Sequence, residues 1–237
     1  MHINACKKNL LLARLDPCEY QRLAARTQLV SLKFRQTLYK YRAPVGHVYF
    51  PVSGAMSALA MMDDGSAIEV ATIGREGVIG QTMLFAGKTS PHEIIVQIAG
   101  AALRMDANVL EQEARRESPL GQLLLRYNMA YLTHISRSVA CNGLHPIQQR
   151  CCRWLLITLD RMESDVIPLT HEFLGIMLGV RRVSVTQVLR ALQDKGLVKN
   201  RRGKIEILDR QALEQLSCEC YRKGRQEFGQ MLGCAAL

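Results

Sequence analysis

The stretch Leu169-Thr-His-Glu-Phe-Leu-Gly-Ile-Met-Leu-Gly-Val-Arg-Arg-Val-Ser-Val-Thr-Gln-Val-Leu-Arg-Ala-Leu192 decides the fold of the second half of the chain. It predicts two amphipathic helices separated by a short turn. Thr170 is a suitable N-cap for the first helix, since its hydroxyl can accept a backbone N–H. Gly179 can end that helix, because glycine adopts the backbone conformations that a tight turn requires. The second helix follows at once, which is the spacing of a helix-turn-helix.

The apolar residues of this stretch follow the helical period, and the remaining side chains suit DNA. The expected buried residues are Phe173, Leu174, Met177, Leu178, Val185, Val188, Leu189 and Leu192. This leaves on the outward faces Arg181, Arg182, Ser184, Thr186, Gln187 and Arg190. Arginine can pair with guanine, glutamine with adenine, and hydroxyl groups with phosphate. The second helix is therefore predicted to read DNA.

Basic charge is concentrated around this helix. The chain has 31 lysine and arginine residues against 21 aspartate and glutamate residues, a formal net charge of +10. Over residues 181–204 the only acidic side chain is Asp194, and a predicted strand-turn-strand over 197–208 adds a wing with Arg201, Arg202 and Lys204. A solvated basic face is the alternative interpretation. A basic helix and wing directly after a turn of the right length favour nucleic acid.

Residues 32–105 carry short apolar segments separated by turn residues. The expected strands are 38–39, 47–50, 56–61, 67–72 and 94–98, with turns at Ser53-Gly54 and Asp64-Gly65. Such frequent turns without a helical period predict a β-roll of the jelly-roll kind. Short helices are expected on either side, over 16–26 and from Asp106.

Between these regions, residues 119–141 contain no glycine or proline after Gly121, which predicts one long helix. One of its faces carries Leu120, Leu124, Tyr127, Tyr131 and His134, and the other carries Leu125, Leu132, Ile135 and Val139. Two apolar faces need two partners. We expect the first face to cover the β-roll and the second to meet the same helix of a second subunit in a homodimer. Burial of the helix within a monomer is the alternative.

His145-Pro146 ends this helix, because the residue before proline is disfavoured in the helical conformation. The predicted fold class is therefore α+β, in three parts. A β-roll sensor domain with short flanking helices covers 1–116, a dimerisation helix covers 117–145, and a winged-helix DNA-binding domain covers 146–237, with the helix-turn-helix at 170–192. The composition, 48% hydrophobic and 22% charged, is that of a globular protein. The apolar run at Leu10 to Leu12 is too short for a signal peptide, so a cytoplasmic protein is expected.

Over nearly its whole length the sequence resembles the Crp/Fnr family of bacterial transcription regulators. The most specific segments are His47-Val-Tyr-Phe-Pro-Val-Ser-Gly54, Glu69-Val-Ala-Thr-Ile-Gly-Arg-Glu-Gly-Val-Ile-Gly80, the helix-turn-helix stretch, and Cys218-Glu-Cys-Tyr221, which is typical of one subgroup. The resemblance implies a cyclic-nucleotide-binding-like β-roll and a homodimer on double-stranded DNA. Its two recognition helices would enter successive major grooves of a palindromic operator. An activator would also contact RNA polymerase.

By position, Arg182 matches the guanine-reading arginine of the cyclic-AMP receptor protein, which belongs to this family. Val183 and Gln187 replace that receptor's glutamate and its second base-reading arginine. The operator is therefore expected to differ from that receptor's. Ser184 is expected to contact phosphate.

The resemblance also implies an effector pocket, to which we assign Glu69, Gly80, Gln81, His92, Glu93, Tyr127 and Tyr131. In cyclic-nucleotide binders of this fold, a Gly-Glu-Leu segment and an Arg-Ser or Arg-Thr pair hold the ribose and the cyclic phosphate. Gly80-Gln81 occupies the first place, and the second falls near His92-Glu93, where a carboxylate would face the anion. We therefore expect that cyclic AMP and cyclic GMP do not bind, which leaves the effector unknown.

The cysteines raise the question of a metal or redox site. Iron–sulfur members of the family use a closely spaced N-terminal cluster, whereas Cys6 and Cys18 are twelve residues apart, so no such cluster is expected. Cys141 and His145 stand at i and i+4 and could share a helix face, while Cys218 and Cys220 face the same way in an extended segment. These four could form a Cys3His site. Free thiols in ordinary packing are the alternative.

Enzyme motifs are missing from the sequence. His92-Glu93 and His171-Glu172 begin like a zinc-protease motif but lack its second histidine, and no phosphate-binding loop or G-x-S-x-G elbow is present. The sequence therefore predicts a DNA-binding regulator that is not an enzyme. Two alternatives stay open: a regulator without a small ligand that responds to its own abundance, to thiol oxidation or to metal, and a sensor that acts on a protein partner.

Overall fold

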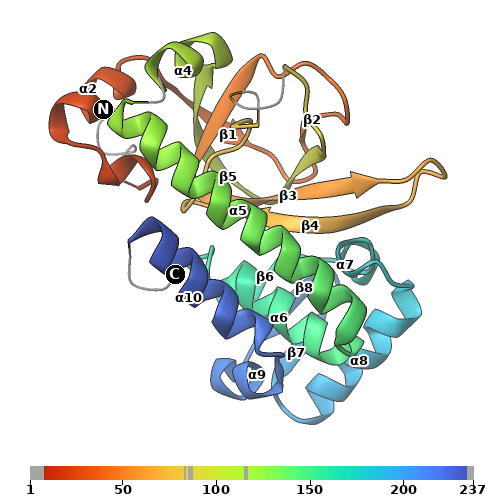
Figure 1. Cartoon of the computed structure of the whole chain (residues 1–237). Helices are drawn as coiled ribbons and strands as arrows, with labels where there is room; N and C mark the ends of the chain where they lie inside the picture. Colours follow the sequence, from red (N-terminus) through yellow and green to blue (C-terminus); the bar gives the residue numbers. More distant parts are fainter. Residues whose placement is uncertain (1–7, 83, 85–87, 115–116, 234–237) are drawn as a thin grey trace.

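The computed structural model describes residues 8–82, 84, 88–114 and 117–233 (Figure 1). Its first part is an antiparallel sheet with strand order β1-β5-β3-β4, in which β2 also pairs with β5. The strands are β1 (Gln28–Leu32), β2 (Thr37–Tyr39), β3 (His47–Met61), β4 (Ala67–Ile73) and β5 (Glu93–Asp106). The flanking helices are η1 (Leu12–Arg14), α2 (Pro17–Ala24) and α4 (Ala107–Glu113). The expected β-sheet domain with short helices on either side is confirmed.

The expected turn at Ser53-Gly54 is wrong, because 47–50 and 56–61 belong to one continuous strand, β3. The pairing of β3 with β5 shifts register on both sides of Ser53, so the strand bends through bulges without leaving the sheet. Gly54 adopts a φ of 78° there, and a side chain would collide with the Ile98 carbonyl oxygen. Glycine therefore marks a bulge at this point, although it also fits the pattern of a turn.

The strand β5 is longer than the expected 94–98, and β1 begins before residue 32. The sequence hides the length of β5 because Ala99-Gly-Ala-Ala102 lacks the large alternating side chains that usually identify a strand. β1 nevertheless pairs with β5 over its whole length, from Gln28 opposite Arg104 to Leu32 opposite Gly100.

Helix α5 (Pro119–Leu144) confirms the expected long helix, and the Ser118 side chain caps its first turn by accepting the Gly121 N–H. The first predicted face is buried against the sheet, with Leu120, Leu124 and Tyr127 almost fully enclosed. The C-terminal helix α10 (Cys220–Leu232), which the sequence analysis did not anticipate, lies along another side of α5 (Figure 1).

The last part of the described chain is a winged helix, as expected. It comprises α6 (Ile147–Leu159), β6 (Val166–Ile167), α7 (His171–Leu178), α8 (Arg182–Asp194), β7 (Val198–Arg201), β8 (Lys204–Ile207) and α9 (Arg210–Leu216). The Thr170 hydroxyl accepts the Phe173 N–H at 3.2 Å, which confirms the N-cap of α7. Gly179 ends α7 in the left-handed conformation, with a φ of 62°.

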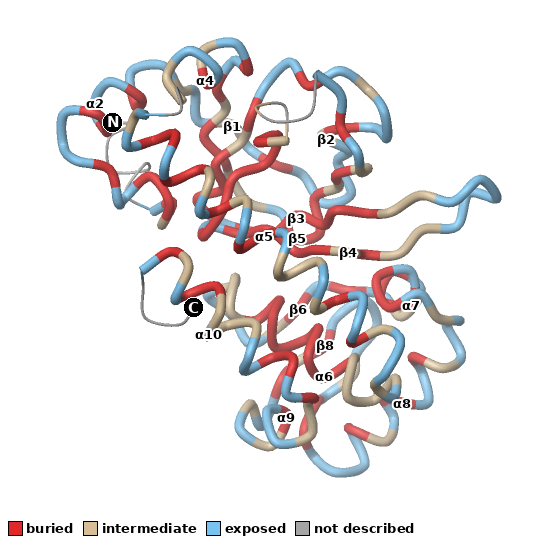
Figure 2. Tube along the Cα trace, viewed as in Figure 1, coloured by how far each residue is buried: buried red, intermediate tan, exposed pale blue. Residues whose placement is uncertain are grey.

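Helix α6 joins the sensor sheet to the winged helix. Every residue from Cys151 to Leu159 is buried, and Figure 2 shows this segment enclosed between the sheet and the other helices. The same apolar cluster contains Ala55, Leu59 and Ile98 of the sheet and the core of the helix-turn-helix. The DNA-binding domain is therefore packed directly against the sensor domain.

A buried polar network crosses this contact. The indole N–H of Trp154 on α6 donates to the Glu69 carboxyl group of β4 at 3.1 Å, and Gln97 of β5 donates to the Thr158 hydroxyl at 2.9 Å. The Ser57 hydroxyl lies 2.9 Å from Glu69 Oε2 and 2.8 Å from Gln97 Oε1. One hydroxyl proton cannot serve both oxygens, whereas a protonated Glu69 could donate to Ser57 and free Ser57 for Gln97.

No helix in the described ranges has both the length and the apolar character to span a bilayer.

Glu69→Gln should change how stability depends on pH. Burial raises the pKa of Glu69 above its ordinary value of 4.5, against the opposing effect of its hydrogen bonds. A carboxyl group whose pKa is higher in the folded state binds its proton more tightly there, so the free energy of unfolding falls as pH rises from 4.5 through the raised pKa. Glutamine has no proton to lose, so the free energy of unfolding of the variant should rise relative to that of the wild type as pH increases.

Urea denaturation from acid to neutral pH measures this difference. Glu111→Gln, at an exposed position on α4, is the matched control and should follow the wild type. A wild type that gains stability over Glu69→Gln with rising pH would instead show an ionised, well-paired carboxylate, contrary to this account.

Candidate nucleic-acid interface

Helix α8 presents the predicted DNA-reading side chains to solvent. Its buried residues are Val185, Val188, Leu189 and Leu192, so the opposite face is directed outward (Figure 2). The exposed side chains on it are Arg181 at the N-cap, Arg182, Thr186, Gln187 and Arg190, while Ser184 is half-buried. Thr170, at the N-cap of α7, is exposed as well.

The wing carries the remaining predicted side chains. Arg201, Arg202 and Lys204 are exposed where β7 turns into β8, and Gly203 takes a φ of 72° in that turn. Arg201 lies 3.6 Å from the Glu206 carboxylate, but the arginine is exposed and the glutamate only half-buried, so this ion pair holds the arginine only weakly. Together α8 and the wing form a continuous basic segment of the sequence whose cationic side chains are exposed.

The structure adds two features of this surface. Val183 is 65% exposed on α8 beside Arg182, an unusual place for an apolar side chain. His171 lies between α7, α8 and β7, with Nδ1 2.9 Å from the Thr186 hydroxyl and Nε2 3.0 Å from Asn200 Oδ1. Thr186 therefore also fixes α8 against its neighbours, which its spacing in the sequence could not reveal.

The residues assigned to the effector pocket are spread over the sheet domain and helix α5. Glu69 lies in the buried network that faces α6. Tyr127 donates its hydroxyl to the Val78 carbonyl oxygen at 3.1 Å and stacks on Tyr131 with ring centroids 6.1 Å apart. Desolvation raises the pKa of both tyrosines, so they stay protonated and uncharged.

The other four assigned residues lie between β4 and the start of β5. Gly80 takes a φ of 94°, and a side chain there would collide with the Tyr39 hydroxyl, while Gln81 is buried next to it. Burial lowers the pKa of His92, which favours a neutral imidazole, and Glu93 is the half-buried first residue of β5. His92 and Glu93 thus offer no cation to a phosphate at the place where the resemblance puts one.

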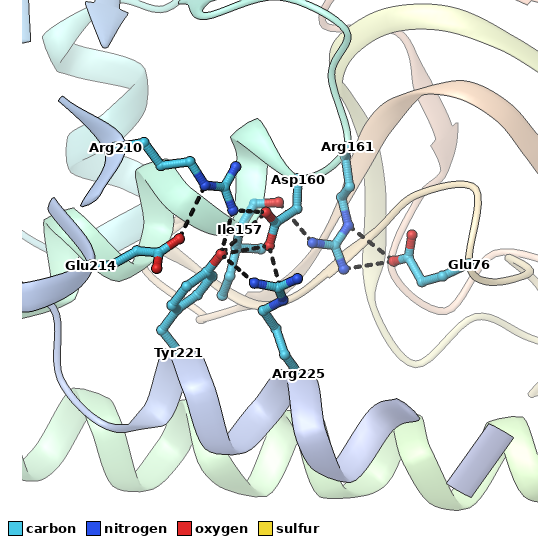
Figure 3. A network of polar contacts seen from close by, with 8 residues as sticks. All are labelled: Glu76, Ile157, Asp160, Arg161, Arg210, Glu214, Tyr221 and Arg225. Atoms are coloured by element: carbon cyan, nitrogen blue, oxygen red, sulfur yellow. Dashed lines mark hydrogen bonds and ion pairs between the residues drawn. The ribbon is translucent and has the colours of Figure 1, made fainter. Parts of the chain in front are cut away.

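An ionic cluster at the C-terminal end of α6, missed by the sequence analysis, holds the domains together (Figure 3). The Arg161 guanidinium donates to the Glu76 carboxylate at 2.6 and 2.9 Å, and both side chains are buried. Asp160 accepts from Arg210 of α9 at 2.5 Å and from the Tyr221 hydroxyl of α10 at 3.1 Å. Tyr221 of the Cys-Glu-Cys-Tyr segment therefore has a structural role.

The structure brings together all four residues of the candidate Cys3His group. Cys141 Sγ lies 3.5 Å from Cys218 Sγ, and Cys220 Sγ lies 3.7 Å from His145 Nδ1. A hydrogen bond from Cys141 lowers the pKa of the Cys218 thiol. Cys151 and Cys152 instead lie in the core of α6, where burial raises the pKa of both thiols. Cys18 is exposed, and Cys6 lies outside the described residues.

Two family models match separate parts of the chain. Residues 29–117 match the family of cyclic nucleotide-binding domains, and residues 149–216 match the Crp-like helix-turn-helix domains. A curated relative, the global nitrogen regulator of Nostoc sp., is 24% identical over 183 residues, which are 73% of this chain and 81% of the relative.

Two solved structures have the same fold. FixK2 from Bradyrhizobium japonicum aligns with a TM-score of 0.69 and 20% identity, covering 81% of this chain and 98% of that one. The c-di-GMP-responsive global regulator CLP of Xanthomonas campestris aligns with a TM-score of 0.65 and 18% identity, covering 82% and 100%. From the two matched domains and their order along the chain, we conclude that this chain belongs to the Crp/Fnr family of DNA-binding transcription regulators.

Proposed function

We propose that the chain acts as a homodimer that binds a palindromic operator through α8 and regulates transcription in response to an effector other than cyclic AMP or cyclic GMP. The observation that carries this proposal is the outward face of α8, where base-reading side chains are exposed beside a basic wing. An activator of this kind would also contact RNA polymerase.

Three neighbouring side chains of α8 supply complementary contacts to base edges. The Arg182 guanidinium suits the two acceptors of guanine, and the Gln187 amide suits the donor and acceptor of adenine. Val183 is exposed between them in the sequence and offers methyl groups for contact with a thymine methyl. Because this set combines one cation, one amide and one apolar group, it favours an operator half-site that contains both G·C and A·T base pairs.

The remaining side chains suit the phosphate backbone. Arg201, Arg202 and Lys204 extend from the turn of the wing, and Thr170 is exposed at the N-terminus of α7. Ser184 and Arg190 flank the base-reading residues on α8. Such contacts fix the position of α8 in the groove and contribute affinity that depends on salt.

The uncovered face of α5 supports the homodimer. Leu125, Met129, Leu132, Ser136, Val139 and Gly143 follow one another at alternating spacings of four and three, which is the heptad pattern of a two-helix seam. Met129, Leu132 and Val139 are 55%, 54% and 63% exposed, although α10 and the sheet cover the other sides of α5. A second copy of α5 would bury this stripe and relate two copies of α8 by a two-fold axis.

The names of the relatives do not identify the effector. The Nostoc relative is named a nitrogen regulator, whereas CLP is named as responsive to c-di-GMP, so the two names do not point to one effector. The exclusion of cyclic AMP and cyclic GMP rests on Gln81, His92 and Glu93, which offer no cation for the cyclic phosphate.

Arg182→Ala and Lys204→Ala should affect DNA binding in different ways. Arg182→Ala should cost about 1–3 kcal/mol at the preferred site and relax one base position, because a base contact is lost. Lys204→Ala should weaken binding to all DNA sequences similarly, because a phosphate contact is lost. The slope of the logarithm of the binding constant against the logarithm of the salt concentration should fall by about one. Selection from random DNA, followed by titrations at two salt concentrations, measures both effects.

Arg26→Ala is the matched control for this experiment, since Arg26 is an exposed arginine next to α2 in the sensor domain. It should bind like the wild type. Equal loss on every sequence for Arg182→Ala, with no relaxed base position, would refute its role in reading bases.

Leu132→Glu should convert the dimer to a folded monomer, because it places a charge in the middle of the proposed α5 seam. Light scattering after size-exclusion chromatography measures the mass, and circular dichroism checks the fold. Met62→Glu, at a side chain of similar exposure in the β3–β4 turn, is the control and should stay dimeric. A monomeric wild type, or a dimeric Leu132→Glu, would contradict the proposed interface.

A further inference from the structure

Three thiols and an imidazole meet where α5, α6 and α10 adjoin. Cys141 lies in the last turn of α5, and His145 is the C-cap whose N–H bonds to the Cys141 carbonyl oxygen. Cys218 and Cys220 approach from the beginning of α10. The three sulfur atoms and one histidine nitrogen all lie within 4.8 Å of one another. Residues distant in the sequence thus present four soft or borderline donor atoms to one point.

The spacing of these atoms fits a tetrahedral zinc ion. With Zn–S near 2.3 Å and Zn–N near 2.0–2.1 Å, neighbouring donors in a tetrahedron of three sulfurs and one nitrogen are about 3.5–3.8 Å apart. The observed separations of 3.5 Å between Cys141 and Cys218 and 3.7 Å between Cys220 and His145 lie in this range. Small adjustments of side-chain angles would complete the coordination.

The orientation of His145 supports the same interpretation. Its Nδ1 faces Cys220, while its Nε2 lies 3.3 Å from the Glu219 carboxylate. Histidines that bind metal usually donate their second ring N–H to such an oxygen, which fixes the tautomer and leaves the other nitrogen free for the ion. Glu219 stands between the two cysteines in sequence, so the Cys-Glu-Cys segment supplies both ligands and this orienting carboxylate.

The surroundings fit a closed site with one excess negative charge. Cys141 is fully buried, and Cys218 and Cys220 are each 4% exposed. Three thiolates around Zn²⁺ leave a net charge of minus one. The buried guanidinium of Arg153, whose charge acts on the Cys141 thiol, has one N–H without a hydrogen-bond partner among the described residues and can balance this charge.

We propose that Cys141, His145, Cys218 and Cys220 bind a zinc ion that joins the end of the dimerisation helix to the beginning of α10. The thiol protons pass to solvent when the ion binds. All four positions are taken by protein, as in structural rather than catalytic zinc sites. Zinc would therefore fix α10 along α5 beside the junction with the winged helix. This site does not require the DNA-binding function proposed above.

Metal analysis of the full chain, purified under reducing conditions, tests the site directly. We expect one zinc ion per chain and, after removal of zinc, uptake of one cobalt ion. The cobalt protein should show thiolate charge-transfer absorption and the strong visible bands of tetrahedral geometry. Cys220→Ser and His145→Ala should lose stoichiometric metal, whereas Cys18→Ser, which removes an exposed cysteine, should retain it.

Glu219→Gln separates positioning from coordination. Because Glu219 would act through His145, its replacement should weaken zinc affinity about 10- to 100-fold and preserve the tetrahedral cobalt spectrum. Thermal unfolding provides a second readout, since zinc should raise the Tm of the metal-free wild type and leave that of Cys220→Ser unchanged.

Three results would overturn the proposal. These are a wild type that binds no stoichiometric zinc or cobalt while its thiols are reduced, a cobalt spectrum that survives Cys220→Ser, and a disulfide between Cys141 and Cys218 in protein taken from reducing cells. The last would show that Cys141 and Cys218 are close together as a disulfide-forming pair and not as zinc ligands.

Discussion

The burial of α6 from Cys151 to its end is the constraint on which the rest of the structure depends. Nine consecutive residues of this helix, Cys151 to Leu159, are enclosed, and a helix buried all round needs apolar partners on every side. The sensor sheet covers one side, and the helix-turn-helix covers another. Separating the two domains would expose this surface to water, so a signal that moves the winged helix must also alter the packing of α6.

Polar contacts make this packing specific. A buried polar group without a partner is costly, so the pairs Trp154–Glu69 and Thr158–Gln97 form in one arrangement of the domains. The ionic contacts at Asp160 and Arg161 extend this network to α9 and α10. The cysteine and histidine group lies next to it, since Cys220 directly precedes Tyr221 at the beginning of α10. The sheet domain, α5 and the DNA-binding domain thus share one connected set of buried contacts.

The sequence was most informative where local chemistry decides the structure. Thr170, Gly179 and the apolar period defined the helix-turn-helix, since caps, turns and amphipathic helices depend on neighbouring residues. It was misleading at Gly54, where a bulge and a turn use the same residue type. The partners of Glu69 and Asp160 could not be predicted, because they come from positions up to 85 residues away. The cysteine group could only be suspected, since its four members meet through tertiary packing.

The central claim is that two copies of α8, related by the α5 seam, read the two halves of one operator. Selection of genomic DNA fragments by the purified protein, followed by footprinting, tests it most directly. The account predicts a palindrome whose half-site centres are about 34 Å apart, one helical turn of DNA. Protection without symmetry, or binding without sequence preference at every salt concentration, would contradict it.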